Sequence, residues 1–424
     1  MKALKVLVLV AIIVAIALPM SVAAQDDPTE VTLWYHSGRE GERTALDDII
    51  DSFNESQGEW VITRTEIPEG SYNDNVKAAS VAGELPCVLD FDGPFIMNYV
   101  YSGDLIPLDE YASDELLSDV LPSIIAQGTY TDGMLYSFGQ FDSGLGLWGN
   151  RAMLEEAGVR IPEGLEDTWT YDEFSAALDA LAAVVPEDGY VIDLKMNYTG
   201  EWSAYAFAPW LMSFGGEVIN RDGYDTADGY LNGPEAVEAF TFLQNLFLDG
   251  YTTDSPVDPD ADFMEGRVPL SYCGHWCYNN YKDALGDDLV LIPQPDFGYG
   301  AVTGMGSWNW GITSTCEVPD GAWAFIEYAM GPDNIILMTE ENGAVPARVS
   351  LLEADERYAE GGDLHIYFRQ LNEGVAIPRA ATVVYPTISS QMETIMRAIA
   401  NGEDVRTTLD EAVAEIDTAI ASFE

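Results

Sequence analysis

Basic residues are scarce in this sequence. The 424-residue chain has 18 lysines and arginines against 72 aspartates and glutamates, and its formal net charge is −54. Such a chain is repelled by nucleic acids and by anionic membrane surfaces, and the same field disfavours anionic ligands. We therefore expect no nucleic-acid partner and no phosphate ligand. Because 47% of the residues are apolar, the chain can still form large cores, and disorder does not explain the composition.

No apolar run is long enough to span a bilayer. The N-terminal run from Val6 to Leu18 has 13 residues, against the roughly 20 that a membrane helix needs. It follows two lysines and precedes small residues, which is typical of a secretory signal peptide. We predict a signal peptide at residues 1–24. No cysteine lies near its end, so we expect no lipid anchor and an exported protein, periplasmic or extracellular.

Histidine and cysteine are also few. Three histidines leave little material for a histidine-rich metal site, and we expect neither a metal nor a cofactor. Four cysteines in an exported chain favour disulfides over free thiols. The sequence leaves open how Cys87 and Cys316 pair.

Cys273 and Cys277 are predicted to form a disulfide. In a tight turn, residues four apart bring their Cα atoms to about 6 Å, within disulfide range, whereas in a straight strand they lie about 13 Å apart. The pairing therefore requires the intervening Gly-His-Trp segment to curl. A zinc site that uses both cysteines and His275 is the alternative, and an exported chain disfavours it.

Strand-like and helix-like segments alternate in the first part of the chain. Strands are predicted at 31–35, 60–64 and 87–91, and helices at 44–53 and 72–81. This alternation favours an α/β fold with a mostly parallel sheet. Ligands of such sheets lie beyond the carboxyl ends of the strands. Those ends carry His36 and Ser37 after the first strand and Asp92 after the third.

Six short motifs, in order along the chain, resemble the extracellular solute-binding proteins of ABC importers, in the branch similar to maltose-binding protein. They are Gly-x-Leu-Ile-Pro-Leu-Asp at 103–109, Thr-Trp-x-Tyr-Asp-Glu-Phe at 168–174, Phe-Gly-Gly at 214–216, Phe-x-x-Gly-Arg with Gly-x-Trp at 263–276, Ala-Trp-x-Phe-Ile at 322–326 and Gly-x-x-Pro-Ala-Arg at 343–348. The resemblance implies a two-lobe, periplasmic-binding-protein-like fold of type II. It also implies a monomer that delivers its ligand to ABC importer permease subunits.

The resemblance further implies that three crossings join the lobes, with one ligand in the cleft between them. We place the crossings near 138–143, 299–305 and 343–348, where glycines are frequent. The N-terminal lobe would then hold residues 25–138 and 304–342, and the C-terminal lobe residues 139–303 and 343–424. Crossings with few side chains can absorb the backbone changes of a hinge while the lobes move as rigid bodies.

We predict that the ligand is a neutral carbohydrate held mainly by Trp276 and Trp308, each near a glycine. An indole ring covers the C–H face of a sugar and leaves the hydroxyl edge free. The polar residues predicted to contact the ligand are Asp92, Asp142, Asn309, Arg348, His36 and Ser37. Core packing is the alternative role for each tryptophan, and the sequence does not exclude it.

Two other functions stay open. An exported glycosidase would need two carboxylates about 5 to 10 Å apart, one of them with a raised pKa, and the sequence gives no such distance. The chain lacks the Gly-x-Ser-x-Gly motif of serine hydrolases and the His spacing of metalloproteases, so we expect no enzyme. A binding protein for a non-sugar solute such as a polyamine is the second alternative.

Overall fold

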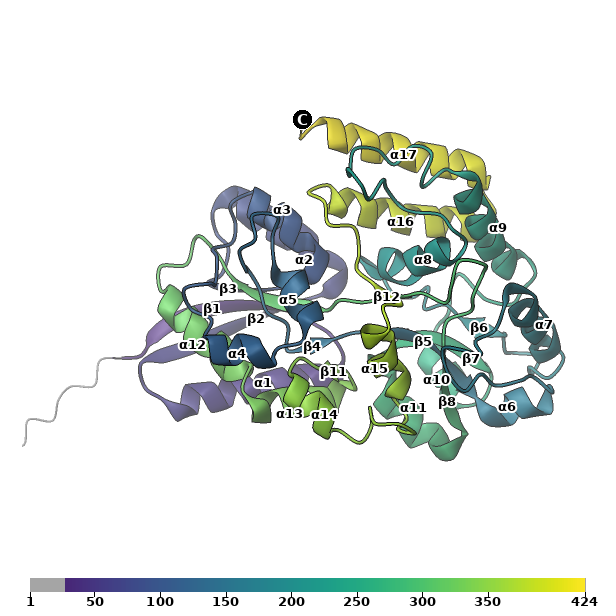
Figure 1. Cartoon of the computed structure of the whole chain (residues 1–424), viewed down its shortest axis with the longest axis horizontal. Coiled ribbons are helices and arrows are strands. Elements are labelled where there is room, and N and C mark those ends of the chain that lie inside the picture. Colours follow the sequence, from purple (N-terminus) through teal and green to yellow (C-terminus); the bar gives the residue numbers. More distant parts are fainter. Residues whose placement is uncertain (1–26, 424) are drawn as a thin grey trace, which may run out of the picture.

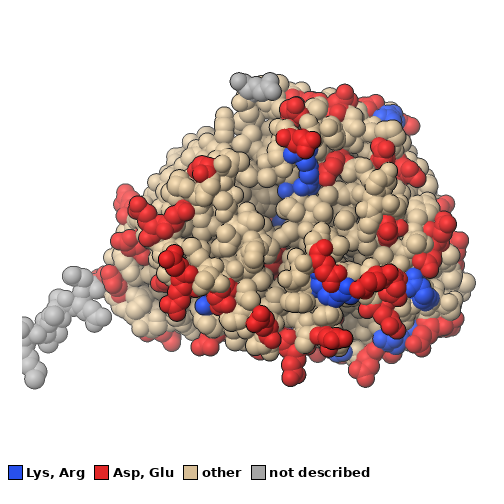
Figure 2. Space-filling view, in the orientation of Figure 1, with Lys and Arg blue, Asp and Glu red and all other residues tan. Residues whose placement is uncertain are grey.

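The computed structural model describes residues 27–423, and two lobes lie side by side in it (Figure 1). The predicted signal peptide, residues 1–24, lies outside the described residues. Among residues 27–423, no helix is both long and apolar enough to cross a membrane. Acidic side chains are spread over the visible surface and basic ones are few (Figure 2).

The sheet of the first lobe confirms the three predicted strands. β1 (Thr29–His36) lies parallel to both β2 (Trp60–Ile67) and β3 (Val88–Asp92). The fourth strand, β10 (Trp308–Ile312), runs antiparallel to β3 and comes from a part of the chain more than 200 residues later. The sheet order is β10-β3-β1-β2. Trp308 and Asp92 are paired in register, so two predicted site residues lie at the same edge of this sheet.

Helices cover both faces of this sheet. α1 (Glu40–Ser56) turns a buried stripe of residues 45, 46, 49, 50 and 53 toward the core, at the helical spacing that predicted it. The other helices that follow this sheet in the chain are α2 (Glu69–Ala82), η1 (Gly93–Phe95), α3 (Ile96–Tyr101), α4 (Asp114–Asp119), α5 (Pro122–Gly128), α12 (Pro319–Ala329), α13 (Pro332–Asn342) and α14 (Val349–Ala354).

The second lobe is built on a sheet with the order β6-β7-β5-β8. β5 (Leu145–Asn150) is antiparallel to β7 (Leu270–Gly274) and to β8 (Leu289–Ile292), and β6 (Ile192–Asp193) is parallel to β7. Its helices are α6 (Arg151–Glu156), α7 (Tyr171–Ala182), α8 (Trp202–Ser213), α9 (Pro234–Leu248), α10 (Pro259–Met264), η2 (His275–Cys277), α11 (Tyr278–Leu285), η3 (Gly286–Asp288), α15 (His365–Asn372), α16 (Tyr385–Ala400) and α17 (Val405–Ala421).

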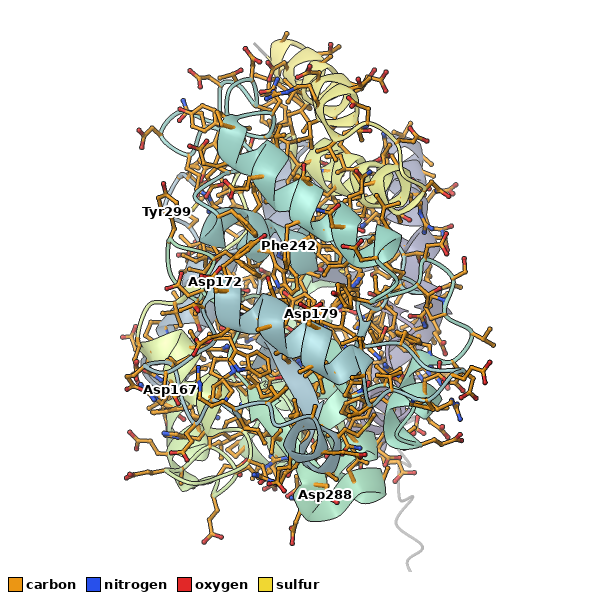
Figure 3. All side chains as sticks on the ribbon, turned by 90° about the vertical axis from the view of Figure 1, so that its right-hand side faces the viewer. Asp167, Asp172, Asp179, Phe242, Asp288 and Tyr299 are labelled. Atoms are coloured by element: carbon orange, nitrogen blue, oxygen red, sulfur yellow. A yellow bond between two sulfur atoms is a disulfide. The ribbon has the colours of Figure 1, made fainter. Side chains whose placement is uncertain are left out.

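Two helices of this lobe show how local sequence sets their burial. α7 begins with the capping box that its sequence predicts, because Thr170 and Glu173 each accept a hydrogen bond from the other's backbone N–H. Its aspartates Asp172 and Asp179 are exposed, as Figure 3 shows, while its apolar face is buried. α8 instead is buried on nearly all sides.

Three of four short, paired strands lie in the segments predicted as crossings. β4 (Phe141–Asp142) is antiparallel to β11 (Val345–Pro346), and β9 (Thr303–Gly304) is parallel to β12 (Ala376–Ile377). In the sequence, β4 lies between β3, which belongs to the first sheet, and β5, which belongs to the second. The sequence did not indicate β12. The lobe boundaries themselves stay a prediction.

Both disulfides of the chain are formed. The predicted Cys273–Cys277 pair is confirmed, with a Cα–Cα distance of 6.4 Å, because the one-turn helix η2 curls the chain after β7. Cys87 pairs with Cys316, which joins the start of β3 to the turn after β10.

Candidate functional site

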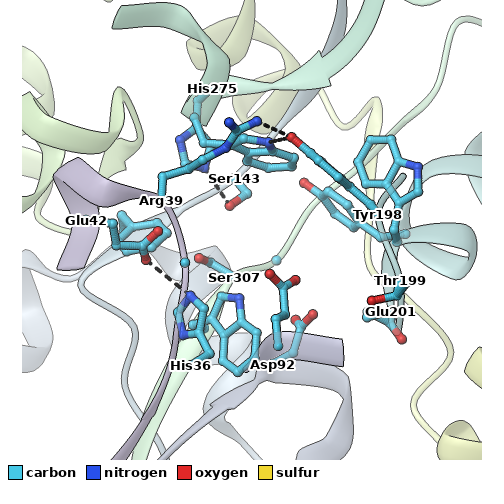
Figure 4. Close-up of a pocket in the computed structure, with 18 of the residues that line it drawn as sticks. His36, Arg39, Glu42, Asp92, Ser143, Tyr198, Thr199, Glu201, His275 and Ser307 are labelled. Carbon is cyan, nitrogen blue, oxygen red and sulfur yellow. Dashed lines mark hydrogen bonds and ion pairs between the residues drawn. The ribbon is translucent and has the colours of Figure 1, made fainter. Parts of the chain in front are cut away.

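A cavity of about 380 Å³ lies between the lobes (Figure 4). The first lobe contributes the end of β1, the start of α1, and the segment of residues 306–308 that leads into β10. The second lobe contributes η2, the residues 197–202 that lead into α8, and Arg379 after β12. The carboxyl ends of β1 and β3 therefore face the second lobe across this cavity. This is where ligands of parallel sheets are expected to lie.

Four of the eight residues predicted to contact a ligand line this cavity together. They are His36, Asp92, Trp276 and Trp308. The other four, Ser37, Asp142, Asn309 and Arg348, are not among the residues that line it.

Each of these four residues has a polar side-chain atom that is engaged by a protein group, although the Oδ1 atom of Asn309 is buried without a partner. The Nε atom of Arg348 lies 2.7 Å from the Asp119 carboxylate. Asp142 is fully buried and accepts hydrogen bonds from backbone N–H groups, including that of Gly306 at 3.1 Å. Asn309 is likewise buried, and its Nδ2–H donates to the Ser307 carbonyl. The Ser37 hydroxyl accepts from the backbone of residue 69. These contacts hold the segments around the cavity, and a ligand contact by any of the four residues stays a prediction.

The rings of His36 and Trp308 stack on each other in the cavity wall of the first lobe. Their rings lie 3.5 Å apart at an angle of 8°. The Nδ1 atom of His36 is 2.5 Å from the Asp90 carboxylate, and its Nε2 atom is 3.5 Å from that of Glu42. Burial alone would lower the pKa of His36, but the two carboxylates outweigh burial and hold it well above its usual value. Trp308 therefore stacks on a ring whose cationic form the two carboxylates favour.

Trp276 lies on the opposite wall, where its ring folds back over Gly274. A Cβ atom at position 274 would come within 2.2 Å of that ring, so only glycine allows this approach. The indole N–H donates to the Tyr198 hydroxyl at 3.3 Å, and Trp202 and Tyr205 pack beside the ring. The sequence did not indicate this packing of the ring on Gly274, although the predicted curl of the disulfide loop is present beside it.

His275, next to Trp276, is a neutral imidazole. Its Nδ1 atom lies 2.8 Å from the carbonyl oxygen of Asn342, so Nδ1 carries the proton. Nε2 then accepts a hydrogen bond from the Ser143 hydroxyl at 3.0 Å. Burial lowers the pKa of His275 to about 4. His275 was predicted only as part of a rejected zinc site, and its place in the cavity wall was missed.

The pKa values of the two histidines in the cavity wall are shifted in opposite directions, upward for His36 and downward for His275. His36 should remain an imidazolium at about pH 7, while His275 should remain neutral at about pH 5. By linkage, the raised pKa of His36 contributes stability that is full below the unfolded-state value and is lost as pH rises through the folded one. The lowered pKa of His275 has the opposite sign: its contribution is lost as pH falls from the unfolded-state value toward about 4.

Ring-nitrogen NMR of the ¹⁵N-labelled protein measures both states directly. The variants His36→Gln and His275→Gln assign the signals. A neutral His36 ring at about pH 7 would contradict the pairing with Asp90 and Glu42.

Two clusters of charged residues cross from one lobe to the other. Arg39, at the start of α1, lies 2.7 Å from the carboxylate of Asp260 in α10 and donates to the Tyr198 hydroxyl (Figure 4). Arg379 binds Asp92 of the first lobe at 2.5 Å and Glu201 of the second at 2.9 Å. The sequence did not indicate either arginine, since the nearest of their partners along the chain, Tyr198, is 159 residues from Arg39.

Lys195 belongs to the first of these clusters, because it also binds Asp260. Its side chain is 0% exposed, and its Nζ atom lies 2.5 Å from Asp193, 2.6 Å from Asp260 and 2.8 Å from the Tyr281 hydroxyl. Its backbone has a φ of 55°, in the left-handed region that non-glycine residues rarely adopt. Such strain persists only where the surroundings determine the conformation. A strained, buried lysine therefore fixes the acceptor for Arg39.

Between residues 27 and 423, no group of three or more histidine, cysteine, aspartate or glutamate side chains is arranged to hold a metal ion.

The sequence matches the family model described as bacterial extracellular solute-binding protein over residues 48–364. The chain is 25% identical to a "probable sugar-binding periplasmic protein" of Rhizobium meliloti, over 96% of this chain and 97% of that one. It is 26% identical to the maltodextrin-binding protein MdxE of Bacillus subtilis, over 55% of each chain.

Solved structures share the fold. The GacH receptor of Streptomyces glaucescens, solved unliganded and with acarbose, superposes with a TM-score of 0.76 at 21% identity, over 93% of this chain and 98% of that one. The substrate-binding protein Lmo0181 of Listeria monocytogenes, in complex with cycloalternan, gives a TM-score of 0.79 at 19% identity, over 93% and 100%. The predicted two-lobe fold of type II is confirmed by these matches.

Proposed function

Since the chain belongs to the family of bacterial extracellular solute-binding proteins, we propose that it captures a neutral sugar or oligosaccharide between its lobes and delivers it to an ABC importer. The observation that carries this proposal is the pair of indole rings, Trp276 and Trp308, on opposite walls of one interlobe cavity. A pyranose ring between them can stack its C–H groups on an indole, while its hydroxyls point to the cavity edges.

Polar groups at those edges suit hydroxyl recognition. The carboxylates of Glu42 and Asp92 line the cavity and can accept hydrogen bonds from sugar hydroxyls, while Tyr198 can donate. The names of similar proteins agree with this ligand class, since one is called a probable sugar-binding periplasmic protein and another a maltodextrin-binding protein. A monomer that meets permease subunits outside the cytoplasm completes the proposal.

We propose a binding protein rather than a glycosidase. Burial raises the pKa of Glu201 to about 7, which a general acid would need, and Asp92 is close to it. However, the Glu201 carboxylate is already held by Arg379, Tyr385 and Ser389. A carboxyl group engaged in this way has no proton directed at a bound sugar. Incubation with saccharides should therefore leave them intact by mass spectrometry.

Thermal-shift screening of the exported form against neutral sugars, polyols, amino acids and polyamines tests the ligand class. A ligand that binds only the folded state stabilises it by about 2.7 kcal/mol at 100 times its Kd. Neutral sugars should raise the melting temperature. A shift with spermidine and with no sugar would contradict the proposal and favour a polyamine.

Ligand binding is proposed to close the lobes by bending the segments of β4, β9 and β11. Closure buries the ligand and creates one surface from both lobes for the permease. Small-angle scattering should give a smaller radius of gyration with saturating sugar. Equal radii with and without the sugar would refute closure.

The Arg39→Gln variant is expected to bind sugar a few-fold more weakly at low salt and to lose this difference at high salt. Arg39 and Asp260 are 33% and 20% exposed, so salt screens their attraction across the cleft. Arg64→Gln is the matched control, because it removes the same charge from an ion pair of the first lobe outside the cavity. A salt-independent loss for Arg39→Gln would mean that Arg39 contacts the ligand instead of closing the lobes.

A further inference from the structure

A second cavity, of about 260 Å³, lies between the lobes on the other side of Arg379. The molecular surface is hollowed between the lobes, with basic side chains beside the hollow (Figure 2). The first lobe lines this cavity with η1, α3 and α5, and the second with Arg221 and Tyr224. Two residues line both cavities, Gly306 and Arg379.

Arg379 forms a rigid partition between the two cavities. Its side chain is only 5% exposed, and its guanidinium is held by Asp92 and Glu201. The same group lies 4.8 Å above the ring of Tyr205, within cation–π distance. Carboxylates on both lobes and an aromatic face therefore fix the arginine in place.

Gly306 closes the remaining space beside the guanidinium. Its φ is 108°, a conformation that favours glycine, and a Cβ atom there would lie 3.0 Å from both Arg379 Nη2 and Gln127 Oε1. Any other residue at this position would strain the backbone and crowd both side chains. Gln127 is itself held, because its amide donates to Asp142.

We propose that Arg379 sets the length of the saccharide by ending the main cavity, so that the ligand has about one or two pyranose rings. This inference rests on the proposed sugar-binding function. A longer chain would have to displace Arg379, which would leave Asp92 and Glu201 buried without their counter-charge. The second cavity has the volume for a further ring and offers the hydroxyls of Ser123 and Tyr224, but the guanidinium separates it from the first.

The binding of a length series to the unmodified protein tests this directly. Isothermal titration with linear glucose oligomers of one to five units, in an α-1,4 and a β-1,4 series, gives the dependence on length. Affinity should stop rising at the disaccharide, and longer oligomers should bind about tenfold more weakly. A trisaccharide that binds about tenfold more tightly than the disaccharide would overturn the inference.

Arg379→Ala should join the two cavities and raise the affinity for the trisaccharide about tenfold relative to the disaccharide. Arg221→Ala is the matched control, since Arg221 lines only the second cavity and its loss should leave the length preference unchanged. If the first variant does not fold, the triple variant Arg379→Ala, Asp92→Asn, Glu201→Gln removes the unpaired charges, and the same ratio is measured. An unchanged ratio in the folded variant overturns the inference.

The two proposals fail in different ways. If no saccharide of any length or linkage binds, the proposed function is wrong. If saccharides bind and affinity keeps rising with length, the sugar-binding function stands and the role of Arg379 is refuted.

Discussion

Replacing Lys195 with methionine is expected to destabilise the protein by about 3–5 kcal/mol, the usual cost of removing one partner from a buried ion pair. Methionine has a similar length, so the cost arises from charge rather than from a cavity. Without Lys195, Asp193 remains 1% exposed with no cation among its described ion pairs. Chemical denaturation that shows a lower midpoint at an unchanged m-value would measure this loss.

A matched control and a rescue make this result specific. Lys282→Met removes the same side chain from a pair with Asp363 in which both groups are substantially exposed, so it should cost less than about 1 kcal/mol. Adding Asp193→Asn to Lys195→Met should restore part of the stability, because the buried carboxylate is then neutral. Equal costs for both lysine variants would contradict the argument.

The loss of stability at acidic pH depends on the same cluster, in which Lys195 and Arg39 bind Asp260. Burial alone would raise the pKa of Asp260, but Lys195 and Arg39 outweigh burial and lower it. A depressed carboxyl pKa contributes stability that is present above the unfolded-state value and is lost as pH falls toward the folded one. The Lys195→Met variant should therefore lose less stability on acidification than the unmodified protein.

Regular amphipathic segments could be predicted from the sequence, because burial of one face leaves a periodic pattern. α1 and the capping box of α7 follow from their spacing alone. α8 has no such pattern, since a helix buried on nearly all sides has no polar face to mark its period. Two-residue strands such as β4 and β12 are too short to leave any pattern.

The candidate site could be predicted only where backbone rules apply. His36 and Asp92 follow from the strand-end rule, and Trp276 from its neighbouring glycine. Asn309 adjoins Trp308, yet alternate residues of a strand point to opposite sides, and Asn309 is buried away from the cavity. Arg379 and its partner Asp92 are 287 residues apart, and no local pattern indicates such a pairing.

Sugar binding is expected to weaken by about 1–3 kcal/mol, roughly tenfold to more than a hundredfold, when Trp276 or Trp308 is replaced by alanine. Each indole lines the cavity and would lose its stacking face toward the ligand. The isothermal titration used for the length series measures both variants. Trp60→Ala is the matched control, because Trp60 is a half-buried tryptophan on β2 that does not line the cavity.

Gly274→Ala separates the position of the Trp276 ring from its presence. The added methyl group would lie 2.2 Å from the ring and must displace it, although the indole and all its bonding capacity remain. If the ring is a stacking platform, Gly274→Ala should weaken sugar binding nearly as much as Trp276→Ala does. The melting temperature of the ligand-free protein should change little for Trp276→Ala, since its ring is only partly buried. Large losses of ligand-free stability, with sugar affinity retained in the folded fraction, would instead identify both tryptophans as core residues.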